Sequence, residues 1–241
     1  MRQQKIKALI VGRNVEILLP KAYDESQAAY PTVYLLDGDA LFPFLDHLPI
    51  EQTSFDFILV GIPASDRISE YTPWPAKALN KRFLDFGGGG SEHLVFLQNQ
   101  IMPRIQEMFH CDSNPESNAI MGYSLGGLLS VYSLFVTEKF GHISSISGSF
   151  WYNGWTQFIE KTYLVNPSAD IYISSGRNEG GRAQDIKKNA ARATEQTFRF
   201  LENALPSNNV YLEWNSYGHH DNIGFKLEAA LSYLNQRINR N

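Results

Sequence analysis

Short apolar runs rich in β-branched residues alternate along the chain with longer segments whose apolar residues recur at helical spacing. An alternation of this kind predicts a mostly parallel central sheet with helices on both of its faces. The predicted strands are residues 7–19, 32–37, 56–62, 117–123, 143–148, 169–175 and 209–215. The predicted helices are residues 91–109, 125–137, 181–204 and 224–237.

Three local features refine this pattern. The opening strands are candidates for an antiparallel edge of the sheet, and Pro103 predicts a kink in the first long helix. The run 87–90 consists only of glycine, but no Gly-Lys-Ser or Gly-Lys-Thr follows it. We therefore interpret it as the entry to the helix that starts near Ser91, rather than as a phosphate loop or a mobile lid.

The bulk composition excludes several classes of protein. The 241 residues can form one α/β domain, and because nothing marks a division, we expect a single domain over 1–241. A net charge of −4 without a basic stripe argues against nucleic-acid binding. The single cysteine, Cys111, allows no internal disulfide and no multi-thiolate metal site. Since neither a signal peptide nor a membrane span is recognisable, we expect a cytoplasmic protein without a membrane partner.

The segment around Ser124 carries the candidate chemistry. A buried strand pattern ends in Gly122-Tyr123-Ser124-Leu125-Gly126, and an apolar helical pattern follows. This is the G-x-S-x-G arrangement, in which small neighbours allow a strained turn between strand and helix to expose the serine oxygen. The pentapeptide alone is weakly specific, and the strand and helix on either side make it informative. The pattern predicts that Ser124 is a nucleophile.

A serine nucleophile needs a histidine base within hydrogen-bond reach. Only His219 and His220 follow the last predicted strand, on a loop before the last helix, where an α/β-hydrolase fold places its base. We favour His220 and keep His219 as the alternative. The remaining histidines lie elsewhere in the sequence, at His47, His93, His110 and His142.

The acid that orients the base is expected at the carboxyl end of the preceding strand, because this fold orders its triad as serine, acid, histidine. The first carboxylate after strand 169–175 is Glu179, which we predict to be the acid. Asp185, within the next predicted helix, is the reserve candidate. Asp170 lies at the wrong end of the strand.

Acyl transfer also requires backbone amides that stabilise an oxyanion. In this fold the residue after the serine supplies one, which is Leu125, and an early turn between a strand and a loop supplies the other. The strand 32–37 ends at Asp37-Gly38-Asp39-Ala40, where either Asp39 or Ala40 can present its amide. We favour Asp39, although Asp-Gly is also a common surface turn.

The chain resembles the putative esterase family of α/β-hydrolases, which includes the enterobactin and salmochelin esterases and related acyl-ester hydrolases such as esterase D. The resemblance covers most of the chain, and several markers occur in the right order. These markers are Tyr34-Leu-Leu-Asp-Gly-Asp39, Val60-Gly-Ile62, Asp66-Arg67, Glu70-Tyr-Thr-Pro73, Gly122-Tyr-Ser-Leu-Gly-Gly127, Ser147-Gly-Ser-Phe-Trp151, Gly176-Arg-Asn-Glu179 and Gly218-His-His-Asp221.

The resemblance implies a mechanism without metal or cofactor, in which Ser124 is the nucleophile, Glu179 the acid and His220 the base. It favours His220 because the family's histidine is typically followed by a small or short polar residue, as Asp221 follows His220. Members that act on siderophores often look like Asp-Arg-x-Arg-Asp-Tyr-Thr-Pro, whereas this chain has Ser69 at the second arginine position. That difference weakens a siderophore assignment.

Three residues are predicted to contact the substrate. Arg67 offers a charge and a planar surface, although a structural ion pair is an equally good interpretation. Tyr123 and Trp151 are aromatic residues beside the predicted site, and Trp151 belongs to a set that lines an acyl or aryl pocket or simply packs in the core. The other members of that set are Tyr71, Trp74, Phe150 and Trp155.

These residues predict a serine carboxylic-ester hydrolase that acts on a small-molecule ester through an acyl-enzyme. A thioester hydrolase of the S-formylglutathione hydrolase type is a close alternative, because the same triad attacks thioesters. A non-catalytic binding protein on a hydrolase scaffold is the alternative from another class. A metal site at His219-His220-Asp221 is disfavoured, because adjacent loop side chains seldom converge on one ion. The sequence does not predict the oligomeric state.

Overall fold

The fold is built on a central β-sheet. A computed structural model of the chain describes residues 3–21, 23–24, 29–46, 55–181, 183 and 185–238. In this described part of the chain, eight strands form one sheet in the order β1-β2-β4-β3-β7-β8-β9-β10. Their bounds are Lys5–Ile10 (β1), Arg13–Leu18 (β2), Thr32–Leu36 (β3), Ile58–Ile62 (β4), Asn118–Tyr123 (β7), His142–Ile146 (β8), Asp170–Gly176 (β9) and Val210–Asn215 (β10). His47 lies outside the described residues.

The strands of this sheet are parallel except at one edge. β1 pairs with β2, and β2 with β4, in antiparallel register, whereas β4, β3, β7, β8, β9 and β10 pair in parallel. The expected antiparallel edge is therefore present. The predicted strand 7–19 is two strands, because the chain reverses at Val11 and Gly12, both of which have positive φ angles.

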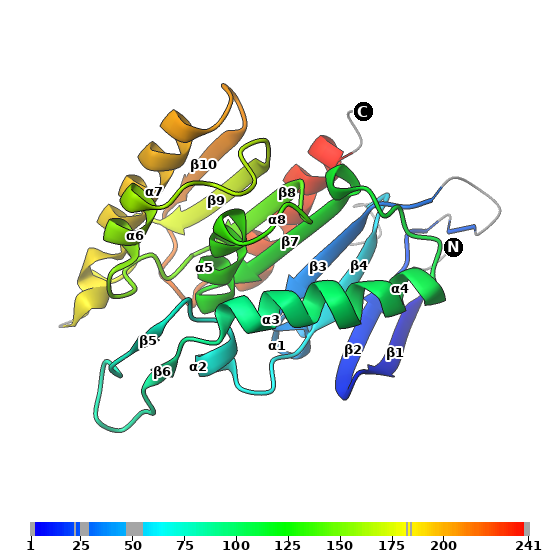
Figure 1. Ribbon diagram of the computed structural model, residues 1–241, viewed down its shortest axis with the longest axis horizontal. Coiled ribbons are helices and arrows are strands. Elements are labelled where there is room, and N and C mark those ends of the chain that lie inside the picture. The colour runs from blue at the N-terminus through cyan, green and yellow to red at the C-terminus, as the bar shows by residue number, and fades with distance from the viewer. Residues whose placement is uncertain are drawn as a thin grey trace.

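Helices cover both faces of the sheet, as the alternating pattern predicted (Figure 1). One face packs against α3, α4, α5, α6 and α7, and the other against α1 and α8. Their bounds are Gly38–Leu45 (α1), Gly90–Phe96 (α3), Met102–Met108 (α4), Leu125–Tyr132 (α5), Trp155–Lys161 (α6), Ala190–Ala204 (α7) and Ile223–Ile238 (α8). This layered, mostly parallel arrangement is the α/β-hydrolase fold.

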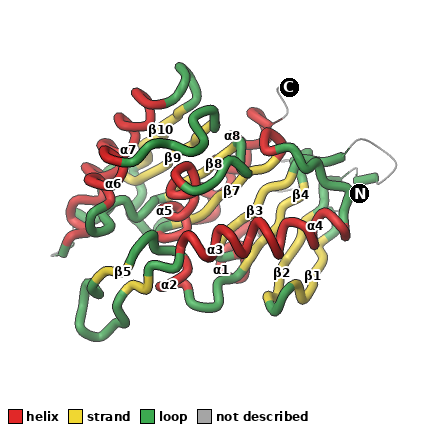
Figure 2. Tube along the Cα trace, in the orientation of Figure 1, coloured by secondary structure: helices red, strands yellow, loops and turns green. Residues whose placement is uncertain are grey.

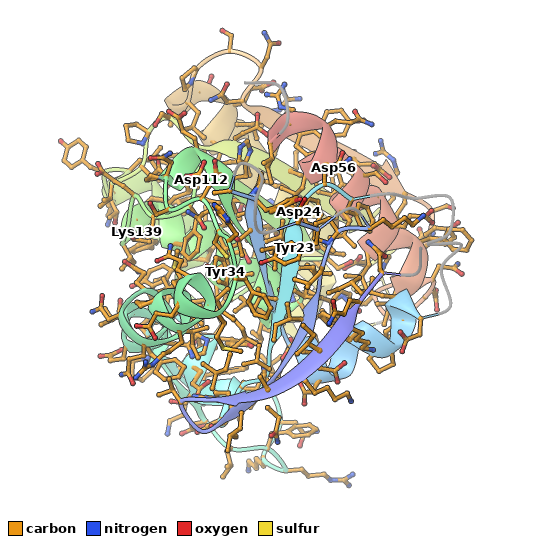
Figure 3. The ribbon with its side chains drawn as sticks, turned by 90° about the vertical axis from the view of Figure 1, so that its right-hand side faces the viewer. Tyr23, Asp24, Tyr34, Asp56, Asp112 and Lys139 are labelled. Carbon is orange, nitrogen blue, oxygen red and sulfur yellow. The ribbon has the colours of Figure 1, made fainter. Side chains whose placement is uncertain are left out.

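The inner strands are buried on both faces, and this explains their continuous apolar sequences. Every residue of β3, β4, β7, β8 and β9 is buried. Tyr34, on β3, is fully buried and lies near the middle of the view in Figure 3, with its ring 6.1 Å from that of Phe140. These strands form a rigid support for the residues at their carboxyl ends.

Two predicted helices differ in detail from the observed ones. The predicted helix 91–109 is α3 followed by a π-helical turn, Leu97–Ile101, and then α4, whose second residue is Pro103. The wide turn accommodates the proline, which has no N–H to donate. The predicted helix 181–204 starts later, because Asp185 caps a short 3-10 turn, Ile186–Asn189, before α7 begins.

Several short elements in the first half of the chain were not predicted. They include α1, the single turn α2 (Arg67–Glu70) and a hairpin of two short strands, β5 (Pro75–Ala76) and β6 (Phe86–Gly87). Figure 2 shows that the loop between β5 and β6 extends away from the main sheet. Its Phe83 side chain is 73% exposed, so this hairpin presents an apolar surface to its surroundings. The glycine run 87–90 ends β6 and starts α3, as its interpretation as a helix entry expected.

Candidate active site

Ser124 occupies a strained turn between β7 and α5. Its backbone angles are φ 60° and ψ −117°, which a residue with a side chain rarely adopts. Gly122 makes the turn possible, because a Cβ at this position would lie 2.5 Å from the carbonyl carbon of Gly126. The strand and the helix therefore approach closely, and Ser124 lines two pockets.

His219 lies between Ser124 and Glu179. Its Nε2 is 3.0 Å from Ser124 Oγ, and its Nδ1 is 2.8 Å from Glu179 Oε2. The three residues follow β7, β10 and β9, whose carboxyl ends meet at the same edge of the sheet. This is the hydrogen-bond chain that a nucleophile, its base and an orienting acid require.

The prediction that His220 occupies this position is wrong, and His219 takes its place. His220 is exposed, and its Nδ1 lies 3.5 Å from the Tyr123 hydroxyl instead. The reason is the anchoring of the loop. The carbonyl oxygen of His219 accepts hydrogen bonds from Tyr123 and from Lys226, and this fixes the main chain so that the His219 ring faces Ser124.

Glu179 is buried and fully hydrogen-bonded. Its side chain is 3% exposed, and Oε1 accepts hydrogen bonds from the Ser147 hydroxyl at 2.6 Å and from the Gly176 amide at 2.9 Å. Burial raises the pKa of this carboxyl group, but the hydrogen bonds from His219, Ser147 and Gly176 outweigh burial and lower it overall. Glu179 is thus an anion in the position to hold an imidazole.

The two other carboxylates considered as the acid lie elsewhere. Asp185 caps the 3-10 turn before α7, where its Oδ1 accepts a hydrogen bond from the Lys187 amide at 2.9 Å. Asp170 is at the opposite end of β9, and its Oδ2 accepts a hydrogen bond from Arg237 Nε at 2.7 Å. Neither contacts His219, so only Glu179 among these candidates can orient it.

The two backbone amides expected to bind an oxyanion are at helix starts. Leu125 begins α5 and Asp39 lies in the first turn of α1, so neither amide has an acceptor within its own helix. The amides of Ala40 and Leu41 donate to the Asp37 carbonyl, which removes Ala40 as an alternative. Asp39 and Leu125 line the two pockets that meet at Ser124, and their role as oxyanion donors stays a prediction.

The predicted substrate-binding residues line these pockets, and two of them have partners within the protein. Arg67 donates from Nε to the Asp37 carboxylate at 2.8 Å and from Nη2 to the Tyr123 carbonyl at 3.2 Å. The Tyr123 hydroxyl donates to the His219 carbonyl. Trp151 lines the larger pocket. Contact of Arg67, Tyr123 or Trp151 with a substrate stays a prediction.

The two pockets differ in size and lining. The smaller one has a volume of about 380 Å³ and is bounded by apolar side chains, among them Leu41, Phe44 and Ile223. The larger cleft has a volume of about 980 Å³ and reaches from His219 to Phe83 on the β5–β6 hairpin. Ser124 lines both, so a ligand bound across the two places its middle at the serine.

Three functional neighbours were missed by sequence reasoning. Ser147 binds Glu179, Lys226 binds the loop of His219, and Ser149 Oγ lies 3.3 Å from Ser124 Oγ. Ser147 and Ser149 directly follow β8, which lies between the strands of the nucleophile and the acid, so their place after a central strand was a usable signal. Lys226 gave no such signal, because its role depends on how α8 packs.

Within the described residues, no three His, Cys, Asp or Glu side chains gather in a way that could hold a metal ion. His219 and His220 are adjacent, but His219 is already engaged on both ring nitrogens. None of the described helices is long and apolar enough to cross a membrane.

Comparisons with known proteins identify relatives of this chain. Residues 7–228 match the model of a protein family described as "Putative esterase". An uncharacterized protein of Bacillus subtilis (strain 168), YbbA, is 35% identical over 196 residues, which are 79% of this chain and 78% of that protein.

Solved structures share the fold at low sequence identity. An IroE-like serine hydrolase from Shewanella oneidensis matches 98% of this chain and 80% of its own with a TM-score of 0.78 and 19% identity. The siderophore hydrolase EstA from Aspergillus nidulans covers 98% of this chain and 94% of its own, with a TM-score of 0.71 and 20% identity. The enterobactin esterase FES from Shigella flexneri covers 98% and 59%, with a TM-score of 0.73 and 19% identity. Because the family model matches residues 7–228, which are most of the chain, the chain belongs to the putative esterase family of α/β-hydrolases and is an esterase.

Proposed function

We propose that this esterase cleaves carboxylic esters through a covalent acyl-enzyme, with Ser124 as nucleophile, His219 as base and Glu179 as the orienting acid. One observation carries the proposal: the His219 ring bridges Ser124 Oγ at 3.0 Å and Glu179 Oε2 at 2.8 Å. These distances lie within hydrogen-bond reach on both sides, without any movement of the chain.

The geometry supports a two-step reaction. The imidazole tautomer with its proton on Nδ1 donates to Glu179, which leaves Nε2 free to take the proton of Ser124 as Oγ attacks the ester carbonyl. The amides of Leu125 and Asp39 stabilise the oxyanion, and protonated His219 then returns its proton to the leaving alcohol. Water repeats the sequence on the acyl-enzyme and releases the acid.

The shape of the site supports an ester with parts of unequal size. A pocket of about 380 Å³ with an apolar lining suits a short acyl chain or a small alcohol. The cleft of about 980 Å³, which the hairpin residues Leu79 and Phe83 extend, suits a larger and partly apolar group. We propose that the scissile bond lies between them, at Ser124.

The charges around the site support an uncharged substrate rather than a large anionic one, because the two cations that line the larger cleft in the described part of the chain, Arg67 and Lys187, are paired with Asp37 and Asp185. FES and EstA are named for enterobactin and for siderophores. In this chain the Arg67 guanidinium is engaged by Asp37 and Tyr123, and the next position that often carries arginine in siderophore esterases is Ser69. Ser69 packs against Gly87, where a Cβ would lie 2.1 Å from its Oγ, so no positive charge comes from this side.

The test compares purified wild type, Ser124→Ala, His219→Gln and His220→Gln on p-nitrophenyl acetate and butyrate, with a fluorophosphonate adduct detected by intact mass. Ser124→Ala is expected to lose turnover and labelling, and His219→Gln to lose about a thousandfold in kcat. His220→Gln, the matched control, is expected to stay within about tenfold of wild type. If His220→Gln is the inactive variant, or if Ser124→Ala still turns over, the proposed triad is wrong.

The same panel tests the thioester alternative. Each p-nitrophenyl ester is paired with a thioester that carries the same acyl group. The ratio of kcat/KM for thioester and ester is corrected for the uncatalysed reactivity of each substrate. A corrected ratio that favours the thioester by more than about a hundredfold would identify the protein as a thioester hydrolase that uses the same triad.

A further inference from the structure

Lys226 is a buried lysine directly behind the candidate triad. It lies in the first turn of α8 and is 3% exposed. Its ammonium group donates to the carbonyl oxygens of Gly218 at 2.8 Å and His219 at 3.1 Å, and to Ser147 Oγ at 3.2 Å. Three donors meet three acceptors, so the group is fully paired. A buried lysine is rare and costs stability unless its charge is compensated, and its partners here all belong to the site.

The first consequence concerns the backbone of the base. The His219 carbonyl accepts one hydrogen bond from Lys226 and a second from the hydroxyl of Tyr123, the residue before the nucleophile. The Gly218 amide donates a hydrogen bond to Asp221 Oδ2 at 2.9 Å, which completes a tight turn. The loop that carries His219 is thereby bonded to the turn at Ser124 on one side and to α8 on the other. These contacts orient the imidazole ring without involving its own nitrogens.

The second consequence concerns charge. Lys226 Nζ lies 3.6 Å from Glu179 Oε1, whereas His219 binds Oε2. Lys226 also donates to Ser147, which in turn donates to Oε1. The ammonium therefore stabilises the carboxylate from the side opposite to the imidazole and does not compete for the oxygen that holds it.

The other titratable groups around Lys226 are His219, His220, Asp221 and Tyr123. Burial lowers the pKa of Lys226, and the charges of Glu179 and Asp221 oppose that shift. Burial also lowers the pKa of His220, and the nearby Lys226 adds to the effect. A cation at this position thus disfavours a positive charge on His220 and favours the anion at Glu179.

We propose that Lys226 is a positioning residue of the ester hydrolase: it fixes the main chain of His219 and stabilises the negative charge of Glu179, the acid that orients the imidazole. This inference rests on the proposed triad. It assigns to α8 a part in catalysis that no motif in the sequence indicates, because the lysine acts through the backbone and through the acid rather than on the substrate.

The test measures kcat, KM and the pH profile of kcat with p-nitrophenyl butyrate for wild type, Lys226→Met and Lys226→Arg. Lys226→Met is expected to lower kcat about a hundredfold with KM nearly unchanged, because a loosened loop misplaces the imidazole. Loss of the cation raises the pKa of Glu179, so the acidic limb of the profile moves to higher pH by about one unit. Lys226→Arg keeps the charge, and its acidic limb stays at the wild-type position.

The matched control is Arg237→Met on the same helix. Arg237 binds Asp170 at the far end of β9, so its loss weakens the attachment of α8 without touching the triad. It is expected to lower the melting temperature and to leave the acidic limb in place. If Lys226→Met does not fold, Lys226→Gln, which keeps donors without charge, is expected to show the same shift of the limb.

The outcomes separate this inference from the proposed function. An unshifted acidic limb in both neutral variants, or wild-type kcat in Lys226→Met, overturns the role of Lys226 while the dependence on Ser124 and His219 stands. Turnover that is independent of Ser124 or His219 overturns the triad itself, and the role of Lys226 with it.

Discussion

Replacing Glu179 by glutamine tests the orienting acid most directly, because the change removes a charge and one acceptor but keeps the shape of the side chain. In the wild type, Oε1 accepts from Ser147 and Gly176 and Oε2 accepts from His219 Nδ1. A glutamine amide has one oxygen and one nitrogen, so it can no longer accept at both ends.

The two orientations of the amide have different costs. If the amide nitrogen faces Gly176, two donors meet, because the Gly176 N–H lies 2.9 Å away and the Lys226 ammonium is nearby. The buried amide N–H then has no acceptor, which costs about 1–3 kcal/mol. If the nitrogen faces His219 instead, the contacts to Ser147 and Gly176 remain, but Nδ1 must become an acceptor. The imidazole then carries its proton on Nε2 and cannot take the proton of Ser124.

The second orientation is favoured, and it predicts a fall in kcat of about 10⁴-fold, which corresponds to about 5 kcal/mol of transition-state stabilisation. The assay is kcat on p-nitrophenyl butyrate, together with the melting temperature and the rate of fluorophosphonate labelling. Asp185→Asn is the control, because the asparagine oxygen still accepts the Lys187 amide and caps the turn, so both kcat and the melting temperature are expected to stay near the wild-type values. A folded Glu179→Gln variant within tenfold of wild type would refute this reasoning.

Two further predictions concern stability. Burial raises the pKa of Glu70, but hydrogen bonds from His93 and Arg13 outweigh it and lower this pKa from 4.5 to about 2. A depressed folded-state pKa contributes stability at higher pH that is lost on acidification. Because solvent screens this partly exposed group, about 1–2 kcal/mol of unfolding free energy disappears between pH 4.5 and about 2. Urea titrations should show this slope in wild type and not in Glu70→Gln, and parallel curves would contradict it. Gly122→Ala is expected to lose about 1–3 kcal/mol and to abolish labelling, because the new Cβ lies 2.5 Å from Gly126. Gly126→Ala is its control, since a Cβ there lies 3.4 Å from its nearest neighbour, and equal melting temperatures of the two variants would contradict the prediction.

The sequence predicted best what depends on buried periodicity. The inner strands appear within a few residues of their predicted positions, because residues buried on both faces leave a continuous apolar signature. The positions of Ser124 and Glu179 at one edge of the sheet followed from the same strands, since a parallel sheet gathers the carboxyl ends of its strands there, and their catalytic roles stay a proposal. These predictions needed no knowledge of how distant elements pack.

What the sequence could not predict depends on tertiary contacts. The helix α1 was interpreted as a turn, because Asp37-Gly38-Asp39 is typical of turns, and only the packing of Gly38 against Gly61 shows that a helix starts there. The choice between His219 and His220 was decided by donors from Tyr123 and α8, which lie far away in the sequence. Adjacent residues carry almost no local information about which of them faces a distant partner.

The contacts of Arg67 also depend on tertiary packing that the sequence does not reveal, and they connect the site to the hairpin. Its guanidinium lies between the Asp37 carboxylate, at the start of α1, and the carbonyl of Tyr123, at the end of β7. These two segments carry the amides expected to bind the oxyanion, and Arg67 bridges them where it lines the two pockets. The elbow and α1 are thereby held at a fixed separation by a residue of α2, the turn that precedes the β5–β6 hairpin. The residues that extend the larger cleft lie on the hairpin, whereas the reacting atoms are held by Arg67 and the sheet. Substitutions in the hairpin can therefore change which substrates the cleft accepts without moving the reacting atoms.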